Sequence, residues 1–324
     1  MDAITAVKGI QVGHASNVAS KTGCTVILCE DGAVGGVEIR GSASGTRQLD
    51  SLYPVHIVRQ VHAVLLTGGS SFGLDAAGGV MRYLEERGKG FDVGVTRVPI
   101  VPTAVIFDLG IGDHRVRPDA AMAYQACLHA SSGTVEEGSV GVGTGATVGK
   151  LFGLERACKG GVGTAGLEGK EGVVVGALAA VNALGDVVDE RTGAIIAGLR
   201  DEKGTRLVST AEQLRQGVWK ERFGGAYRGN TTIGVVATNV ALTREDAIKV
   251  AQMTHNGLAK VISPINTTFD GDIVFALSLG KLKGDVNHVG ALAEAAIMEA
   301  VKRGVMKADG FGLLPAYRDL KKGD

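Results

Sequence analysis

The chain alternates short apolar runs of strand length with a few stretches of helical spacing. Residues 25–29, 34–39 and 62–67 are apolar runs as long as strands, and two glycines follow the last of them. Residues 74–87 carry apolar side chains at helical spacing, and residues 118–129 begin with a proline that suits a first helical turn. The first half therefore predicts strands and helices that alternate along the chain.

The second half begins with Val- and Ala-rich runs that glycines interrupt, as in residues 172–184. Such runs predict consecutive strands joined by tight turns. Residues 231–241 are the strongest β-forming run, and residues 271–279 predict another strand. Thr243 is expected to open a helix, because acidic residues follow it and complement the helix dipole. Residues 287–303 predict an Ala-rich helix.

These elements favour an α+β fold, which we expect to be a layered sandwich of two central sheets flanked by helices. No internal repeat and no long linker divides the chain, so we expect a single domain over residues 1–324. Residues 201–228 are the most polar segment and predict a surface loop with a short helix near residues 211–216. A break in the chain would cost little stability there.

Composition and charge narrow the class of protein. The 34 basic and 34 acidic residues cancel, so charge gives no reason to expect nucleic acid or an anionic membrane as a partner. The 50 glycines follow no collagen period and indicate tight turns and close backbone approaches. No signal peptide and no membrane-spanning stretch is visible, so we expect a cytoplasmic protein with free thiols.

Two common sites are not expected. The seven histidines are scattered, and no Cys or His spacing suits zinc, so we predict neither a metal nor another cofactor. Residues 143–150 (GTGATVGK) resemble a phosphate-binding loop but depart from its pattern at Thr144 and Leu151. Glycine turns in a sheet account for this string better than nucleotide binding does.

A serine nucleophile is one possible chemistry. Residues 69–73 (GSSFG) match G-x-S-x-G between an apolar strand and a helical pattern, which is the context of a nucleophile elbow. Ser71 would need a later histidine, and His255 and His288 are available. The string also reads as a glycine turn with a serine at the start of a helix. An α/β-hydrolase-type esterase that uses Ser71 is therefore the alternative function.

A threonine nucleophile is the other possible chemistry. Asn230 and Thr231 stand directly before the strongest strand. If the bond between them broke, the freed α-amine of Thr231, with an ordinary pKa of about 7.7–8.0, could serve as the base for its hydroxyl. Asp270 and Asp272 open the next strand, and alternate residues of a strand face the same side. An Asx-rich turn is common, and on the residues alone it is the preferred explanation of the two aspartates.

The chain resembles a known family through several long strings in a fixed order. The family is that of the L-aminopeptidase/D-esterase and the β-aminopeptidases, which includes the nylon-oligomer hydrolases, and the resemblance covers nearly the whole chain. The elbow-like string GGSSFG falls within the shared pattern, which weakens the esterase interpretation of Ser71. The strings are GIQVGHAS (9–16), LTGGSSFGLDAAGGV (66–80), PTAVIFDLG (102–110), GTGATVGK (143–150), VNALGDVVD (181–189) and GNTTIGVVATN (229–239).

The resemblance implies a precursor that cuts itself before a Ser or Thr, here into an α fragment of residues 1–230 and a β fragment of residues 231–324. The first residue of the β fragment would be the nucleophile. The implied fold is similar to that of N-terminal-nucleophile hydrolases, with a different strand connectivity. The implied substrates are short peptides, β-amino acid amides or related small amides. No cofactor is implied, and we expect a homo-oligomer, most simply a tetramer.

Site residues follow from the matching positions. The resemblance places the nucleophile at Thr231 and the carbonyl of the cut bond at Asn230. Asp270 and Asp272 match the two acidic or polar positions that assist the nucleophile, and two aspartates with a threonine are typical of the nylon-oligomer hydrolases. Asn182 matches the amide that stabilises the oxyanion, a role that needs a donor aimed at the developing charge.

Two further positions complete the expected site. Lys150 matches a lysine near the nucleophile in the nylon-oligomer subgroup. Phe107 falls where the family has an active-site tyrosine, so the hydroxyl is missing and the substrate preference is put in question. A third hypothesis is an oligomeric binding protein that keeps the scaffold without activity. An intact mass separates the first hypothesis from the other two, because only self-cleavage gives two fragments. Replacing Ser71 by Ala would abolish only the esterase.

Overall fold

A nine-stranded mixed sheet organises the computed structural model, which describes residues 2–218 and 229–320. Two neighbouring pairs, β14 with β16 and β4 with β7, are parallel, and the other pairs are antiparallel. The strands follow in the order β10 (Gly161–Glu168), β11 (Val174–Asn182), β14 (Thr231–Val240), β16 (Ile273–Leu282), β2 (Thr22–Ile39), β4 (Val61–Thr67), β7 (Thr103–Val105) and β3 (Thr46–Arg47), with β1 (Gln11–Asn17) beside β2.

Strand β2 joins the two parts of this sheet, which are strands β10, β11, β14 and β16 on one side and strands β4, β7 and β3 on the other. Its first part pairs with β4, and its last part pairs with β16, with a shift of register between Leu28 and Ala33. The strands expected at residues 25–29 and 34–39 are therefore two parts of one 18-residue strand. A mixed α and β architecture with a central sheet is confirmed. The expected sandwich of two central sheets is not confirmed, because the strands form one hydrogen-bonded path.

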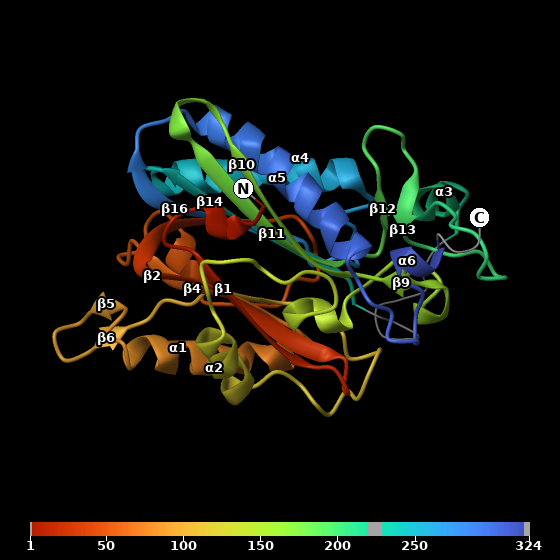
Figure 1. The fold of residues 1–324 in the computed structure, drawn as a ribbon, viewed down its shortest axis with the longest axis horizontal. Helices are drawn as coiled ribbons and strands as arrows, with labels where there is room; N and C mark the ends of the chain where they lie inside the picture. The colour runs from red at the N-terminus through yellow and green to blue at the C-terminus, as the bar shows by residue number, and fades with distance from the viewer. Residues whose placement is uncertain (1, 219–228, 321–324) are drawn as a thin grey trace.

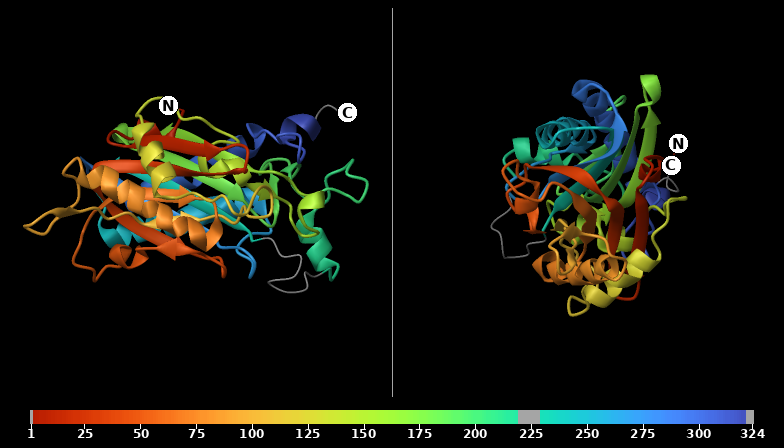
Figure 2. Two further views of the ribbon diagram at one scale, coloured as in Figure 1. Left: turned by 90° about the horizontal axis from the view of Figure 1, so that it is seen from below. Right: turned by 90° about the vertical axis from the view of Figure 1, so that its left-hand side faces the viewer.

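Helices cover the sheet on both outer sides (Figure 1, Figure 2). Helices α4 (Arg244–Val261) and α5 (Val286–Met306) lie along one face, and α1 (Ala77–Glu85) and α2 (Ala120–Leu128) lie at the opposite side. One apolar cluster packs α4 and α5 against β11, β14 and β16, and another packs α1 and α2 against β2 and β4. A third cluster fills the space between the two parts of the sheet. The functional residues are thus carried on strands whose two faces are buried.

Shorter elements connect these layers. The expected short helix near residues 211–216 is α3, while residues 219–228 of the polar segment lie outside the described residues. None of the described helices combines the length and low charge that a membrane span needs. The shorter elements are η1 (Ile4–Ala6), η2 (Leu49–Leu52), η3 (Ser70–Ala76), β5 (Phe91–Asp92), β6 (Arg97–Val98), η4 (Gly141–Gly145), β8 (Thr147–Val148), η5 (Leu154–Arg156), β9 (Cys158–Lys159), η6 (Lys170–Gly172), β12 (Asp186–Val188), β13 (Ile195–Ala197), α3 (Thr210–Arg215), β15 (Ile262–Ser263) and α6 (Tyr317–Leu320).

The connection from β14 to β16 brings two functional segments together. Thr243 opens α4 as expected, since its hydroxyl accepts the Asp246 N–H at 3.1 Å and the Asp246 carboxylate accepts the Thr243 N–H at 3.3 Å. Helix α4 carries the chain back along the sheet, so that β14 and β16 run parallel. Parallel strands begin at the same edge of a sheet. The segments before β14 and before β16 therefore lie side by side, and an isolated bridge pairs Asn230 with Asp270.

Glycine lets α5 lie directly on β10. A Cβ atom at Gly163 would stand 2.2 Å from the carbonyl oxygen of Ala300 and 2.4 Å from the nitrogen of Gly304. Both contacts are to backbone atoms of α5, which cannot move aside as a flexible side chain can. The high glycine content thus includes positions where a helix and a strand are in backbone contact.

We predict that Gly163→Ala lowers the free energy of unfolding by about 1–3 kcal/mol, because the added methyl group overpacks this contact. Gly78→Ala is the matched control, since its Cβ would meet nothing nearer than the Ala120 Cβ at 4.0 Å. Removing a helical glycine there should stabilise the fold by roughly 0.5–1 kcal/mol. Urea denaturation measures both variants, and equal effects would show that the close packing at Gly163 is unimportant.

Candidate active site

Thr231 begins β14 and lies between two neighbouring strands. On one side it pairs with Asn182, the last residue of β11. On the other side is the segment that leads into β16, where Asn230 bridges to Asp270. Thr231 is 4% exposed, and Asn230, Asn182 and Asp270 are buried. The bond between Asn230 and Thr231 is therefore held on both sides by the sheet.

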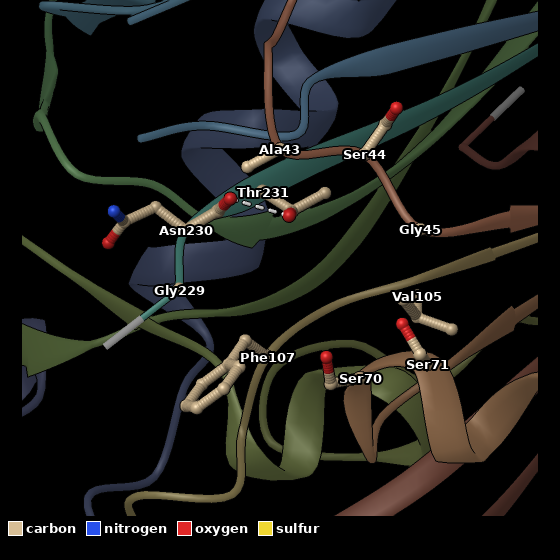
Figure 3. A pocket seen from close by; sticks show the side chains of 10 residues that line it. All are labelled: Ala43, Ser44, Gly45, Ser70, Ser71, Val105, Phe107, Gly229, Asn230 and Thr231. Atoms are coloured by element: carbon tan, nitrogen blue, oxygen red, sulfur yellow. Dashed lines mark hydrogen bonds between the residues drawn. The ribbon is translucent and has the colours of Figure 1, made fainter. Parts of the chain in front are cut away.

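The carbonyl group of Asn230 is the centre of this arrangement. Its oxygen accepts the Thr231 hydroxyl at 2.5 Å (Figure 3). It also accepts the Gly271 N–H at 2.9 Å. A Cβ atom at position 271 would stand 2.8 Å from the Thr231 hydroxyl oxygen and 2.7 Å from the Ala43 carbonyl oxygen. Glycine is thus required for this approach. A side-chain hydroxyl and a backbone N–H thus both contact the Asn230 carbonyl oxygen.

The two expected aspartates hold the backbone around Thr231. The Asp272 carboxylate accepts the Thr232 N–H at 2.6 Å and the Asn266 N–H at 2.9 Å. The Asp270 carboxylate accepts the Leu184 N–H at 3.2 Å and both the N–H and the hydroxyl of Thr267, at 3.2 and 2.5 Å. Within the described part of the chain, neither carboxylate is hydrogen-bonded to the Thr231 hydroxyl.

Burial governs the protonation of this pair. Burial raises the pKa of Asp270. Burial is also the largest cause of the raised pKa of Asp272, and the negative charge of Asp270 raises it further. The backbone donors and the charge of Lys150 act in the opposite direction on both groups. Two carboxylates so close together in a buried site cannot both be charged at ordinary cost, so the pair favours a state with one proton.

Lys150 and Asn182 contact the carbonyl of Gly229, the second residue before the expected cut. The Lys150 ammonium, on a side chain that is 1% exposed, donates to the Asn182 carbonyl at 2.8 Å, the Asn182 Oδ1 at 2.7 Å and the Gly229 carbonyl at 3.2 Å. The Asn182 amide donates to the carbonyls of Phe107 at 3.3 Å and Gly229 at 3.5 Å. Its donor therefore contacts the carbonyl that precedes the one it was expected to stabilise.

The five residues expected to be catalytic thus surround one peptide bond. Lys150 binds Asn182, Asn182 pairs with Thr231, and Asp272 binds the N–H of Thr232, while Asp270 bridges to Asn230. The Gly271 donor could not be predicted from the sequence, because a backbone N–H is not marked by the type of side chain. Among the described residues no group of three His, Cys, Asp or Glu side chains could hold a metal ion.

A cavity of about 360 Å³ opens beside Thr231 (Figure 3). The Ser70 and Ser71 hydroxyls lie across the cavity from Thr231, and Phe107 contributes its ring, as expected for a pocket residue. Residues 43–45, a run of small side chains that no sequence motif marked, form another wall. The lining residues are Ala43, Ser44, Gly45, Ser70, Ser71, Val105, Phe107, Gly229, Asn230 and Thr231.

The elbow-like string has no partner histidine in the described structure. It leads into the 3-10 helix η3, with positive φ at Gly69, which precedes this helix, and at Ser70, its first residue. Ser71 does line the cavity, but none of the described residues lining it is a histidine. His255 is buried and has its Nε2 against the Glu38 carbonyl at 3.1 Å. The string therefore shapes the wall opposite Thr231.

The carboxyl group of Asp108 holds the Gly69 end of this wall in place. Its carboxylate accepts the Gly69 N–H and the Thr22 hydroxyl, each at 2.7 Å, and it is 5% exposed. Burial raises the pKa of Asp108 to about 6, although these hydrogen bonds oppose the shift. The neutral form of the carboxyl is therefore favoured by folding.

Known proteins are similar to this chain in sequence and in fold. A family model described as peptidase family S58 matches residues 2–312. An uncharacterized aminopeptidase of Mycobacterium tuberculosis is 43% identical, over 100% of this chain and 99% of the relative. A 6-aminohexanoate-oligomer endohydrolase of Kocuria sp. is 31% identical, over 90% of this chain and 83% of the relative.

Two solved structures have a similar fold. The L-aminopeptidase D-Ala-esterase/amidase of Ochrobactrum anthropi, described as a variant of the Ntn hydrolase fold, superposes with a TM-score of 0.73 at 20% identity, over 95% of this chain and 86% of the other. A β-aminopeptidase of Burkholderia sp. gives a TM-score of 0.68 at 22% identity, over 99% and 93%. At these identities the likeness concerns the fold alone. The resemblance found in the sequence is confirmed.

The raised pKa of Asp108 predicts a pH-dependent stability difference. The pKa of Asp108 is higher in the folded state than its unfolded value of 3.8, so the folded state binds this proton more tightly. The proton's contribution to the free energy of unfolding is complete at low pH and is lost as the pH rises to about 6. Asp108→Asn keeps a neutral group in place and escapes this loss. Between about pH 4 and pH 7 the wild type should lose about 2–3 kcal/mol of unfolding free energy relative to the variant. Urea denaturation at both pH values measures this, and parallel pH profiles would contradict it.

Proposed function

The chain belongs to peptidase family S58, whose members hydrolyse amide bonds, and we propose that it is a self-processing amide hydrolase with Thr231 as nucleophile. The observation that carries the proposal is the Asn230 carbonyl, whose oxygen contacts both the Thr231 hydroxyl at 2.5 Å and the Gly271 N–H at 2.9 Å. Attack by this hydroxyl on the adjacent carbonyl carbon would cut the chain between Asn230 and Thr231.

Self-cleavage proceeds through an ester in this proposal. The Thr231 Oγ1 adds to the Asn230 carbonyl carbon, and its proton passes through a bridging water to the Asp270–Asp272 pair. The oxygen of the resulting five-membered ring carries negative charge, which the Gly271 N–H stabilises. As the C–N bond breaks, the carboxyl pair returns this proton to the departing nitrogen, which frees the neutral amine of Thr231 and leaves an ester. One water then hydrolyses the ester, giving the Asn230 carboxylate and a free Thr231 hydroxyl.

Turnover uses the same oxygen with a new base. The freed α-amine of Thr231 takes the hydroxyl proton as Oγ1 attacks a substrate amide, and the leaving amine receives a proton as the acyl group is transferred. A water then releases the acid. The cavity of about 360 Å³ is of a size for small substrates, so we propose short peptides, β-amino acid amides or related small amides. Lys150 and Asn182 complete the proposed site.

The cut fragments are expected to stay together. Strand β14 would belong to the β fragment, but it pairs through eight residue pairs with β11 of the α fragment. Strand β16 pairs in the same way with β2. The proposal therefore keeps one folded unit with a chain break in it. It also includes the expected cytoplasmic homotetramer without a metal or other cofactor, for which the sequence resemblance is the argument.

The first prediction is cleavage between Asn230 and Thr231. Denaturing gels and intact mass should show fragments 1–230 and 231–324, with the second beginning Thr-Thr-Ile-Gly. Thr231→Val removes the hydroxyl but keeps the side-chain shape, so this variant should stay one folded chain. Its amide hydrolysis should fall by on the order of a thousandfold or more.

Thr232→Val is the matched control, because the Thr232 hydroxyl has no hydrogen-bond partner within the described residues. Both Thr232→Val and Ser71→Ala should still be cut. A Thr231→Val chain that is cut at this bond would refute the proposal. Loss of activity with Ser71→Ala in a fully cut chain would instead favour the esterase alternative.

The second prediction is a pH dependence of self-cleavage. Burial and the Asp270 charge raise the pKa of Asp272, and a protonated pair accepts a proton poorly, so cleavage should slow as the pH falls through a range well above 3.8. Asp270→Asn removes the like charge. The pKa of Asp272 then falls, and the midpoint of the cleavage profile should move to lower pH.

Fragment formation after cell-free synthesis, followed on denaturing gels at a series of pH values, gives this midpoint. Asp92→Asn changes an exposed carboxylate in the β5–β6 hairpin and should leave the profile unchanged. A midpoint that stays in place or moves to higher pH in Asp270→Asn would remove the coupled carboxyls from the proposed mechanism.

A further inference from the structure

The buried carboxamide of Asn230 is only half satisfied by its surroundings. Asn230 is 1% exposed, and its side chain is directed away from Ser70 and Ser71 (Figure 3). Its Nδ2 donates to the Phe269 carbonyl at 3.2 Å, whereas its Oδ1 has no hydrogen-bond partner within the described residues. We propose that in the cut enzyme this place becomes a subsite for an ammonium group on the side chain of the substrate's acyl group. This inference rests on Thr231 as the nucleophile.

Self-cleavage and turnover would form the same bond, and this locates the acyl group of a substrate. In both reactions Thr231 Oγ1 bonds to the acyl carbon, and the Gly271 N–H faces the acyl oxygen. In the intact chain the acyl group is that of Asn230, whose carbonyl oxygen accepts the Thr231 hydroxyl at 2.5 Å and the Gly271 N–H at 2.9 Å. An amino acid amide in the same position would direct its side chain to the place that the Asn230 side chain leaves.

The surroundings of this carboxamide suit a group that only donates hydrogen bonds. A carboxamide carries two N–H donors and an acceptor oxygen. The Phe269 carbonyl accepts from the donor side, but none of the described residues donates to the oxygen of Asn230. A buried acceptor without a donor is destabilising. An ammonium has three donors and no acceptor, so it would keep the bond to the Phe269 carbonyl and remove the unpaired oxygen.

The charges beside the start of β14 also favour a cation here. Phe269 directly precedes Asp270, and the carboxyls of Asp270 and Asp272 carry at least one negative charge between them, which attracts an ammonium. Lys150 would repel it, but the Lys150 ammonium is already bound to three acceptors, two of them on Asn182 of β11. Because β14 lies between β11 and β16, Lys150 and the two carboxyls approach the start of β14 from opposite neighbours.

The length of the asparagine side chain sets the chemical class of the substrate. Three carbons, Cα, Cβ and Cγ, separate the acyl carbon of Asn230 from its Nδ2. An amide of L-2,4-diaminobutanoic acid has the same three carbons and ends in an ammonium instead of a carboxamide. The subsite would thus select amides of α-amino acids that have a short basic side chain and a free α-amino group.

Three p-nitroanilides, each with a free α-amino group, test the subsite on the cut wild-type enzyme at neutral pH. The L-2,4-diaminobutanoyl compound brings an ammonium to the place of the Asn230 carboxamide. The L-asparaginyl compound reproduces that carboxamide, and the L-2-aminopentanoyl compound has a methyl group there. We expect kcat/KM of the diaminobutanoyl compound to exceed that of each of the other two by about tenfold or more, because only this compound bonds to the Phe269 carbonyl without adding an unpaired oxygen.

A fourth compound separates the position of the charge from its sign. L-2,3-diaminopropanoyl p-nitroanilide has the same charges, but its side-chain ammonium is one bond nearer to the acyl carbon and would not reach the Phe269 carbonyl. We expect this compound to be cut about tenfold more slowly than the diaminobutanoyl compound. Equal rates for the two would show a general preference for positive charge and would overturn the subsite. Thr231→Val supplies the background rate for all four compounds.

The outcomes separate this inference from the proposed function. An asparaginyl or 2-aminopentanoyl compound that is cut as fast as the diaminobutanoyl compound would overturn the subsite. A cut enzyme that leaves the diaminobutanoyl compound intact would also overturn it. In contrast, a chain that remains in one piece, or hydrolysis that persists in Thr231→Val, would refute the proposed nucleophile itself.

Discussion

The register of β14 between its two neighbours is the constraint on which the site depends. The antiparallel ladder with β11 sets Thr231 opposite Asn182, and the parallel pairing with β16 sets Asn230 beside Asp270. A slip of one residue would turn Thr231 to the other face of the sheet and bring Thr232 into its place. Because α4 returns the chain so that both strands start at one edge, a single sheet edge carries Thr231, the two carboxyls and the Gly271 donor.

Burial of charge gives this edge its chemical character. Lys150, Asp270 and Asp272 are all nearly inaccessible to water, and buried charges are tolerated only when hydrogen bonds and opposite charges compensate them. One ammonium and a pair of carboxyls that shares one proton are balanced in charge, which agrees with the raised pKa values of both aspartates. In the proposed mechanism the cut adds an amine at Thr231. Its protonated form would favour ionisation of the second carboxyl.

Much of this arrangement could be predicted from the sequence, and the exceptions have a common cause. The strand beginning at Thr231, the helix that Thr243 opens and the meeting of Lys150 with Asn182 at one bond follow from local pattern or from matched motifs. The Gly271 donor could not be predicted, since every residue except proline has a backbone N–H. Only the fold places this one against the Asn230 carbonyl. The merging of two expected strands into β2 likewise depends on strands β4 and β16, which are distant in sequence.

In the proposed mechanism the Asn230 acyl group lies beside Thr231 before the cut, and the sheet determines how easily residues 229 and 230 can leave afterwards. Residues 229 and 230 are held by hydrogen bonds to the Gly229 carbonyl, by the Asn230 amide on the Phe269 carbonyl at 3.2 Å, and by the bridge to Asp270. Each such bond contributes only about 1 kcal/mol, or somewhat more where Lys150 is the donor. The eight-pair ladder between β11 and β14 begins at Thr231 and is untouched when the segment leaves. A cut at this bond would therefore let residues 229 and 230 leave while Thr231 stays fixed in the sheet.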